Sequence, residues 1–286
     1  MTPPASSRPR IAFTLDDGYS DFVTEAMPIL AEFDCPITVF LATSVVDREC
    51  WYWYDQVTFA FAETRETQLR MAFGHGEVSY SWGNEHERYK ARGHLIERLK
   101  TIPQPERIEA LSRVGPALGV EIPRVPTDAY ATMTWDDVKR CAAGGLVTFA
   151  PHSMTHPPLD TISAEHSRAE IEGSWARLKA AGAGVVPIFC YPFGAYGLRE
   201  VEILARSEMV GAVTTEYRYA GPRPFDQSHG NRRFTVPRIS YDESESTFLQ
   251  AVIGLERLKL GLRKGAKGWS PAGAPPEIGA RGSEFV

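Results

Sequence analysis

The strongest constraint on the fold of this chain comes from two polar segments, each of which follows a short apolar run. The segment T-L-D-D-G, residues 14–18, follows an apolar run at 11–13, and H-S-M-T-H, residues 152–156, follows another at 146–150. Short apolar runs that end at turn residues are typical of buried strands. One carboxylate and two imidazoles are three protein ligands, which is the number that an open metal site needs. We therefore predict that the two segments meet around one metal ion.

The order of elements along the chain predicts a parallel sheet. A helical pattern at 20–33 separates the first apolar run from a second one at 37–41, and strand–helix alternation returns after residue 134. This order is typical of parallel sheets. Residues 48–130 interrupt this alternation of strands and helices. They contain aromatic residues, a polar stretch with glycines, and two amphipathic helical patterns, and we interpret the whole segment as a mainly helical insertion. The remaining strands are expected at 185–191, 210–214 and 235–240, and the remaining helices at 134–143, with Thr134 as its cap, 163–181, 198–207 and 246–262.

Composition indicates a soluble globular protein. Hydrophobic residues make up 43% of the 286 residues and charged residues 23%, and no apolar run approaches the roughly 18 residues of a membrane span. Residues 1–10 lack the apolar stretch of a secretory signal, so a cytoplasmic location is expected. The net charge of −5, without a long basic block, argues against nucleic acid as a partner. The oligomeric state does not follow from the sequence.

Two further expectations concern the cysteines and the domain organisation. The cysteines are scattered without a C-x-x-C pair, which favours reduced thiols over a disulfide framework. We expect one catalytic domain over residues 1–263, interrupted by the insertion at 48–130. Residues 264–286 are rich in Gly, Pro and Ala and are expected to form a disordered tail.

The two motifs resemble those of the NodB-homology polysaccharide deacetylases, carbohydrate esterase family 4. The family motif T-F-D-D-G corresponds to residues 14–18, and H-[ST]-x-x-H corresponds to residues 152–156, which Pro157 follows. The resemblance covers about residues 10–242 apart from the insertion. It implies an α/β fold, a distorted (β/α) barrel of the NodB type, with the site at the carboxyl ends of the strands.

The resemblance also implies a role for each polar residue of the two motifs. Asp16 would be the general base, and Asp17, His152 and His156 would bind a divalent metal, commonly zinc, with cobalt, nickel or manganese as alternatives. The chemistry of adjacent carboxylates agrees, because a cation that binds one of them leaves the other able to take a proton from water. The alternative for all four residues is a structural role in turns and in the core.

The third family motif is altered in this chain. The pattern R-x-P-[YF] aligns with residues 190–193, so Cys190 stands where the family has the arginine that orients the base. We expect Arg238, on a late strand, to supply that charge; the alternative is an ordinary surface or salt-bridged arginine. The histidine that protonates the leaving amine in the family has no clear match, and His229 and Asp242 are candidates by position. The segment after Cys190 is predicted to line the acetyl pocket, or to form a turn packed by aromatics: Tyr191, Pro192, Phe193 and Gly194.

The most aromatic stretch of the chain is W-Y-W-Y at residues 51–54. Strand-like alternation would place Trp51 and Trp53 on one face, where sugar rings could stack on them. The alternative is that the insertion buries both indoles.

These observations predict a metal-dependent hydrolase that removes N-acetyl groups from the amino sugars of an acetylated saccharide, in bacterial surface glycan biosynthesis. Three alternatives stay open: a deformylase or other hydrolase of non-peptide C–N bonds, an O-acetyl esterase, and a sugar-binding protein that kept the metal site without turnover. An ester needs less help from a general acid than an amide, because an alcohol leaves more easily than an amine.

Overall fold

The computed structural model describes residues 11–74, 76–182, 184–221, 224–240 and 245–253. The chain falls into two compact units, residues 1–238 and 239–286. The second unit contributes one described helix, α9 (Glu245–Val252). The boundary predicted at 263 and the tail predicted at 264–286 lie outside the described residues.

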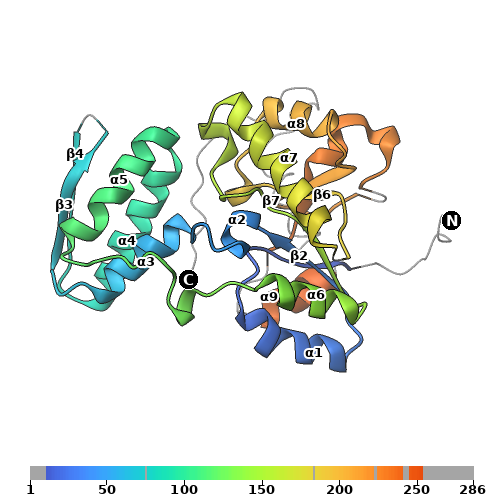
Figure 1. The fold of residues 1–286 in the computed structure, drawn as a ribbon, viewed down its shortest axis with the longest axis horizontal. Helices are drawn as coiled ribbons and strands as arrows, with labels where there is room; N and C mark the ends of the chain where they lie inside the picture. The colour runs from blue at the N-terminus through green and yellow to red at the C-terminus, as the bar shows by residue number, and fades with distance from the viewer. Residues whose placement is uncertain (1–10, 75, 183, 222–223, 241–244, 254–286) are drawn as a thin grey trace. The chain divides into compact units, whose positions relative to one another are not determined.

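Two three-stranded sheets of parallel strands form the framework of the first unit (Figure 1). Each predicted strand is confirmed, with its bounds shifted by a few residues. An isolated parallel bridge between Phe149 and Val185 continues the first sheet toward the second. The first sheet has the order β1 (Phe13–Leu15), β2 (Ile37–Leu41), β5 (Val147–Pro151), and the second has the order β6 (Ile188–Cys190), β7 (Gly211–Tyr217), β8 (Val236–Arg238).

The predicted α/β fold with parallel strands is therefore confirmed. Among the described residues no backbone ladder closes the strands into a full ring. The first and last strands are instead joined by a side chain, because Nη1 of Arg238 on β8 donates to Oγ1 of Thr14 on β1 at 3.1 Å. This link brings the carboxyl ends of β1 and β8 together, as a barrel-like arrangement requires.

The helices of this α/β core lie close to their predicted bounds, except for the short helix α2, which was not predicted. The helix predicted at 20–33 is a π-helical turn over 22–26 that α1 continues. Thr134 caps α6 through a reciprocal capping box with Asp137, as predicted, and Gly182 ends α7 with a φ of 68°. No described helix is long and apolar enough to cross a membrane. The helices are α1 (Met27–Glu32), α2 (Thr43–Val46), α6 (Trp135–Ala143), α7 (Ala164–Ala181) and α8 (Leu198–Ala205).

The insertion is mainly helical, as predicted, but it also contains a β-hairpin. The polar stretch that contains glycines, for which no strand was predicted, forms two antiparallel strands. The alternation of buried and exposed side chains that marks the first of these strands covers only a few residues. Leu69, Met71 and Phe73 are buried, whereas the residues between them are exposed. These side chains pack with the helices in one hydrophobic cluster. The elements are α3 (Trp53–Glu63), β3 (Gln68–Phe73), β4 (Gly76–Ser81), α4 (Glu85–Lys100) and α5 (Gln104–Ala117).

The strand-like reading of residues 51–54 is wrong, because α3 begins at Trp53. Successive side chains on a helix turn by about 100° and do not alternate between two faces. Trp51 and Trp53 are both buried. Trp51 packs edge-on against the rings of Phe59 and Tyr130. Burial favours the packing alternative for both indoles over stacking on a sugar.

Candidate active site

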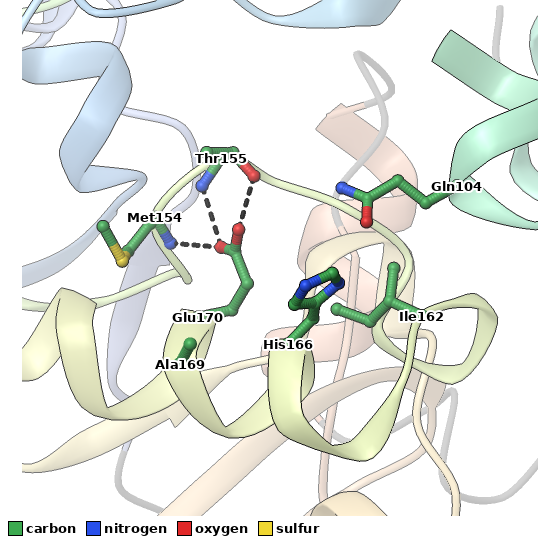
Figure 2. Close-up of a pocket in the computed structure, with 7 residues that line it drawn as sticks. All are labelled: Gln104, Met154, Thr155, Ile162, His166, Ala169 and Glu170. Atoms are coloured by element: carbon green, nitrogen blue, oxygen red, sulfur yellow. Dashed lines mark hydrogen bonds between the residues drawn. The ribbon is translucent and has the colours of Figure 1, made fainter. Parts of the chain in front are cut away.

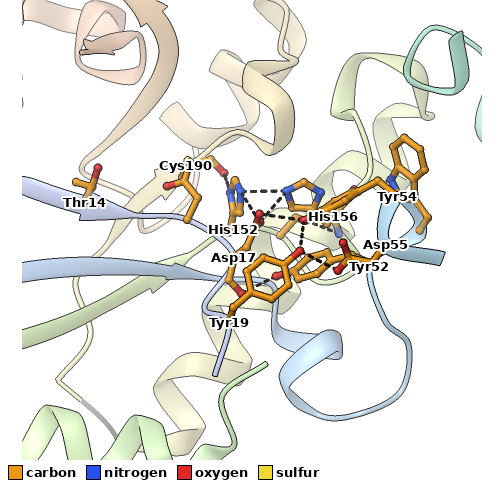
Figure 3. A network of polar contacts seen from close by, with 12 residues as sticks. Thr14, Asp17, Tyr19, Tyr52, Tyr54, Asp55, His152, His156 and Cys190 are labelled. Atoms are coloured by element: carbon orange, nitrogen blue, oxygen red, sulfur yellow. Dashed lines mark hydrogen bonds and ion pairs between the residues drawn. The ribbon is translucent and has the colours of Figure 1, made fainter. Parts of the chain in front are cut away.

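Three metal-ligating side chains converge at the carboxyl ends of β1 and β5 (Figure 3). Asp17 lies two residues beyond β1, and His152 follows β5 directly. Nε2 of His156 lies 3.1 Å from Nε2 of His152 and 3.2 Å from Oδ1 of Asp17. Nε2 of His152 lies 3.5 Å from the same oxygen. The structure thus brings together the three residues that the motifs predicted as ligands.

The spacing of these three atoms fits a tetrahedral metal site. Ligand atoms that each lie 2.0–2.1 Å from a tetrahedral zinc ion are about 3.3 Å apart. Oδ1 of Asp17 is buried and accepts no hydrogen bond from the described residues. A buried carboxylate oxygen without a donor is costly unless a cation is bound to it. The residues present therefore fit a divalent cation of the kind predicted.

Hydrogen bonds from the surrounding chain fix the orientation of the ligands. Nδ1 of His152 lies 2.8 Å from the carbonyl oxygen of Cys190 and can only donate to it, which leaves the Nε2 lone pair for a metal. The indole of Trp53 donates to the carbonyl oxygen of His156 at 3.4 Å. The ring of Phe193 packs edge-on against that of His156, with ring centroids 4.5 Å apart.

The tyrosines of the aromatic stretch, not its tryptophans, contact the candidate metal ligand Asp17 (Figure 3). Tyr54 donates to Oδ2 of Asp17 at 2.9 Å, and Tyr52 donates to its carbonyl oxygen at 2.7 Å. Neither tyrosine was predicted from the sequence as part of the site. The strand pattern that we applied to residues 51–54 selects the two tryptophans. The start of a helix at Trp53 would have been the signal against that pattern.

A chain of hydroxyl groups continues from Asp17 to a second buried carboxylate. The hydroxyl of Tyr19 lies 3.4 Å from that of Tyr54 and donates to Oδ2 of Asp55 at 2.8 Å. Burial raises the pKa of the Asp55 carboxyl to about 7, the hydrogen bond from Tyr19 opposes that rise, and the charge of Asp17 adds to it. Asp55 also lines a cavity of about 450 Å³ together with Tyr19 and Tyr130. The sequence analysis assigned no role to Asp55.

The structure places Arg238 on the carboxylate of Asp16, as predicted. Its Nη1 and Nη2 donate to Oδ1 and Oδ2 of Asp16, each at 2.7 Å, which is the bidentate geometry of a strong ion pair. Burial on its own would raise the pKa of the Asp16 carboxyl. The hydrogen bond from Arg238 and the charges of His152 and Arg238 outweigh that effect and lower the pKa to about 2. Asp16 is therefore ionised at neutral pH.

The altered third motif makes room for this arginine. Nη2 of Arg238 lies 3.2 Å from Sγ of Cys190, and its Nε donates to the carbonyl oxygen of Thr214 at 3.1 Å. Cys190 is fully buried, so its small side chain leaves the space that the guanidinium of Arg238 fills from β8. The charge that the family supplies from the third motif thus arrives from another strand. The catalytic role that we assign to Arg238 stays a prediction.

The residues after Cys190 divide between the core and the site. Tyr191 is fully buried, donates to the carbonyl oxygen of Phe234 at 3.0 Å and stacks on Tyr196. Pro192 is also buried, so packing is favoured for both over contact with a substrate. Gly194 has a φ of 66°, and a Cβ there would lie 2.0 Å from Oγ1 of Thr215. In this segment the ring of Phe193 contacts the ligand His156, and its predicted role in substrate binding is untested.

The predicted acids are not tested by the structure. The side chain of His229 and all of Asp242 lie outside the part of the chain that is described. All four cysteines are free.

Tyr54→Phe is expected to weaken zinc binding by about 10-fold, because loss of an outer hydrogen bond to a metal ligand typically has an effect of this size or larger. The substitution removes only the hydroxyl that holds Oδ2 of Asp17. Competition with a zinc-binding dye measures the affinity. Tyr80→Phe is the matched control, because the Tyr80 hydroxyl is buried and has no hydrogen-bond partner among the described residues. Equal affinities of the two variants would contradict the prediction.

Gly18→Ala is expected to destabilise the protein by about 1–3 kcal/mol, the usual cost of overpacking. Gly18 has a φ of +65°, and a Cβ there would lie 2.2 Å from Cδ2 of Leu41. Unfolding in urea measures the change in the free energy of unfolding. Gly93→Ala is the control with the opposite sign, because no heavy atom lies within 4 Å of its added Cβ and alanine favours a helix. A stability of Gly18→Ala equal to that of wild type would show that this turn tolerates a side chain.

Comparisons with known proteins agree with the geometry. The profile of the family described as "Polysaccharide deacetylase" matches residues 4–110 and 120–211, which is more than half of the chain. Arg238 lies beyond the matched ranges. A comparison with curated proteins finds no match.

Several solved structures are similar to this chain at low sequence identity. The Streptococcus pyogenes deacetylase PplD, solved in complex with acetate, is 17% identical over 84% of this chain and 69% of that chain, with a TM-score of 0.49. A de-N-acetylase from Aggregatibacter actinomycetemcomitans is 14% identical over 86% and 77%, with a TM-score of 0.49. The BpsB deacetylase domain from Bordetella bronchiseptica is 17% identical over 80% and 70%, with a TM-score of 0.42.

Proposed function

The chain belongs to the polysaccharide deacetylase family, and from that premise we propose that it is a metal-dependent hydrolase that removes N-acetyl groups from the amino sugars of a saccharide. The observation that carries this proposal is the convergence of Asp17, His152 and His156 next to an Asp16 carboxylate that Arg238 holds in place. A role in bacterial surface glycan biosynthesis and a cytoplasmic location are the finer parts of the proposal.

The side chains of the site divide the work of amide hydrolysis. Asp17, His152 and His156 would hold a divalent cation, which would supply Lewis acidity to the acetyl carbonyl and to the attacking water. Asp16 accepts the proton of that water, and its ion pair with Arg238 keeps it ionised and in one orientation. The rings of Tyr52, Tyr54 and Phe193 pack against the imidazole of His156, which is buried.

Three alternatives would use the same residues differently. An O-acetyl esterase is favoured if no side chain delivers a proton to the leaving group, because an alcohol leaves with less assistance than an amine. A deformylase or another hydrolase of non-peptide C–N bonds would keep the site and change the acyl group. A sugar-binding protein without turnover would need the cation and would not need an ionised Asp16 next to it.

The deciding experiment measures acetate release from a panel of N- and O-acetylated saccharides. The protein is stripped of metal, reloaded with zinc, and compared with Asp17→Ala. Zinc-dependent release from N-acetylated sugars that is lost in the variant would support the proposal, and release only from O-acetylated sugars would favour the esterase. No release by folded, zinc-loaded protein would overturn the deacetylase proposal and favour another acyl group or a binding role.

A further inference from the structure

The turn between the two histidine ligands has a strained backbone. Ser153 has a φ of 65° and His156 has a φ of 57°, both in the left-handed region that residues other than glycine rarely adopt. Such a conformation costs about 1–3 kcal/mol per residue and persists only where the surrounding structure enforces it. The contacts of the turn therefore decide whether the two imidazoles are placed for a metal.

Neighbouring backbone groups hold the carbonyl oxygens of this turn. The N–H of Thr43, at the start of α2, donates to the carbonyl oxygen of Ser153 at 3.1 Å, and the N–H of Ser44 donates to that of Met154 at 3.0 Å. Inside the turn, the N–H of His156 donates to Oγ of Ser153 at 3.0 Å. The N–H groups of Met154 and Thr155 find their partner on a different element.

One side chain from a different element takes both of these N–H groups. Oε2 of Glu170, on α7, accepts from the N–H of Met154 at 2.7 Å and from that of Thr155 at 2.9 Å. Its other oxygen, Oε1, accepts from the hydroxyl of Thr155 at 2.5 Å. Figure 2 shows the carboxylate of Glu170 lying under the turn, with all three hydrogen bonds directed to it.

An apolar contact on the same face of α7 supports the polar one. Gly173 lies three residues after Glu170, so the two positions share one face of the helix. A Cβ at Gly173 would lie 2.4 Å from Sδ of Met154. Because Gly173 has no side chain, the side chain of Met154 packs closely against α7. This contact lies next to the hydrogen bond between Glu170 and the Met154 backbone.

We propose that Glu170 is a positioning residue of the metal site, which sets metal affinity by holding the turn at residues 153–155 in the conformation that directs His152 and His156 toward Asp17. The inference rests on the proposed function in requiring that the site binds a divalent metal. Its physical basis is preorganisation: a turn that is already ordered does not lose conformational entropy when the metal binds. Glu170 does not touch the metal ligand atoms, so it acts through the backbone.

The test measures zinc affinity by competition with a zinc-binding dye in four variants of the full chain. Glu170→Ala removes all three hydrogen bonds and is expected to weaken zinc binding by about 10- to 100-fold, the range typical of outer-shell partners. Glu170→Gln keeps an oxygen for the two N–H groups and can donate to Oγ1 of Thr155, so its affinity is expected to stay within about 3-fold of wild type. Glu172→Ala is the control on the same helix, since Glu172 has only an exposed pair with Arg168 at 3.4 Å.

Glu170→Asp tests whether the length of the side chain at position 170 matters, or only its negative charge. Its carboxylate is one methylene too short to span the turn, so zinc affinity is expected to fall although the charge is kept. If the charge of Glu170 merely attracted the cation, Glu170→Asp would bind like wild type and Glu170→Gln would bind weakly, and that outcome would overturn the proposal. Unchanged affinity in Glu170→Ala would also overturn it. Thermal unfolding of the metal-free proteins identifies a misfolded variant, and the remaining Glu170 substitutions then decide the question.

Zinc affinity is read without a saccharide, so this inference and the proposed function can fail separately. A wild-type protein that binds zinc and releases no acetate would overturn the deacetylase proposal, while the ranking of the Glu170 variants would still test the positioning role. A protein that deacetylates normally and binds zinc with equal affinity in all variants would overturn the positioning role alone.

Discussion

Asp16→Asn is expected to release acetate about 10²- to 10⁴-fold more slowly than wild type, the typical contribution of a general base, and to retain zinc. Asparagine has the shape of aspartate but cannot take a proton from water. Its amide oxygen can still accept from Arg238, so the surrounding hydrogen bonds are disturbed as little as the exchange allows. The rate under saturating zinc and the dissociation constant for zinc are measured together.

The two readouts separate catalysis from assembly of the site. Asp21→Asn is the matched control, because Asp21 is an exposed aspartate a few residues further along the chain. Loss of zinc binding in Asp16→Asn, to the same degree as in Asp17→Ala, would mean that Asp16 is a ligand. An unchanged rate would remove Asp16 from the chemistry and favour the sugar-binding alternative.

Arg238→Met is expected to slow acetate release by about 10²-fold, because a catalytic group displaced by about 1 Å can lose that much. The substitution removes both hydrogen bonds that orient the Asp16 carboxylate. It also removes the hydrogen bond and the charge of Arg238 that oppose the effect of burial, so the pKa of Asp16 rises from about 2 although the charge of His152 still lowers it. A base works when it is deprotonated, so the acid limb of the pH–rate profile is expected to move to higher pH.

Two further substitutions isolate the cause of this effect. Arg238→Lys keeps a positive charge but not the two-pronged donor geometry, so it should restore the low pKa of Asp16 more fully than the rate. Arg232→Met, at an exposed arginine close by in the sequence, is the control. An acid limb that does not move in Arg238→Met would contradict the link between the two residues.

The same ion pair has a consequence for stability. The pKa of Asp16 is lower in the folded protein than its ordinary value of 3.8. Its contribution to the free energy of unfolding is therefore present above pH 3.8 and is lost as the pH falls toward 2. In Arg238→Met that contribution is reduced, and unfolding in urea at pH 3 and pH 7 should differ less than in wild type.

The convergence of the candidate ligands and the strand framework were predictable because each depends on short segments. An apolar run followed by T-L-D-D-G encodes both a strand and the carboxylates at its end, and H-S-M-T-H does the same for the imidazoles. Parallel strands place their carboxyl ends at one edge, so the two segments meet wherever the sheet forms. The capping of α6 by Thr134 was equally local, since both partners of the capping box lie within one helical turn.

The insertion was harder to predict because its local signals conflict. The strand at β3 has only three buried side chains, and the charged residues and glycines around it are typical of a loop. The aromatic run at 51–54 suits a strand by composition, yet its second half begins a helix. Packing with α4 and α5 in one hydrophobic cluster outweighs the intrinsic preference of these residues.

By itself the sequence determined the candidate ligands Asp17, His152 and His156, the neighbouring carboxylate Asp16, and the parallel strands that carry them, because each of these features depends on a few consecutive residues. Only the tertiary structure decided what holds the site in place. Tyr54 and Glu170 reach it from a helix of the insertion and from α7. Such contacts join residues that are distant along the chain, and no local pattern specifies which distant side chain will fill a given space.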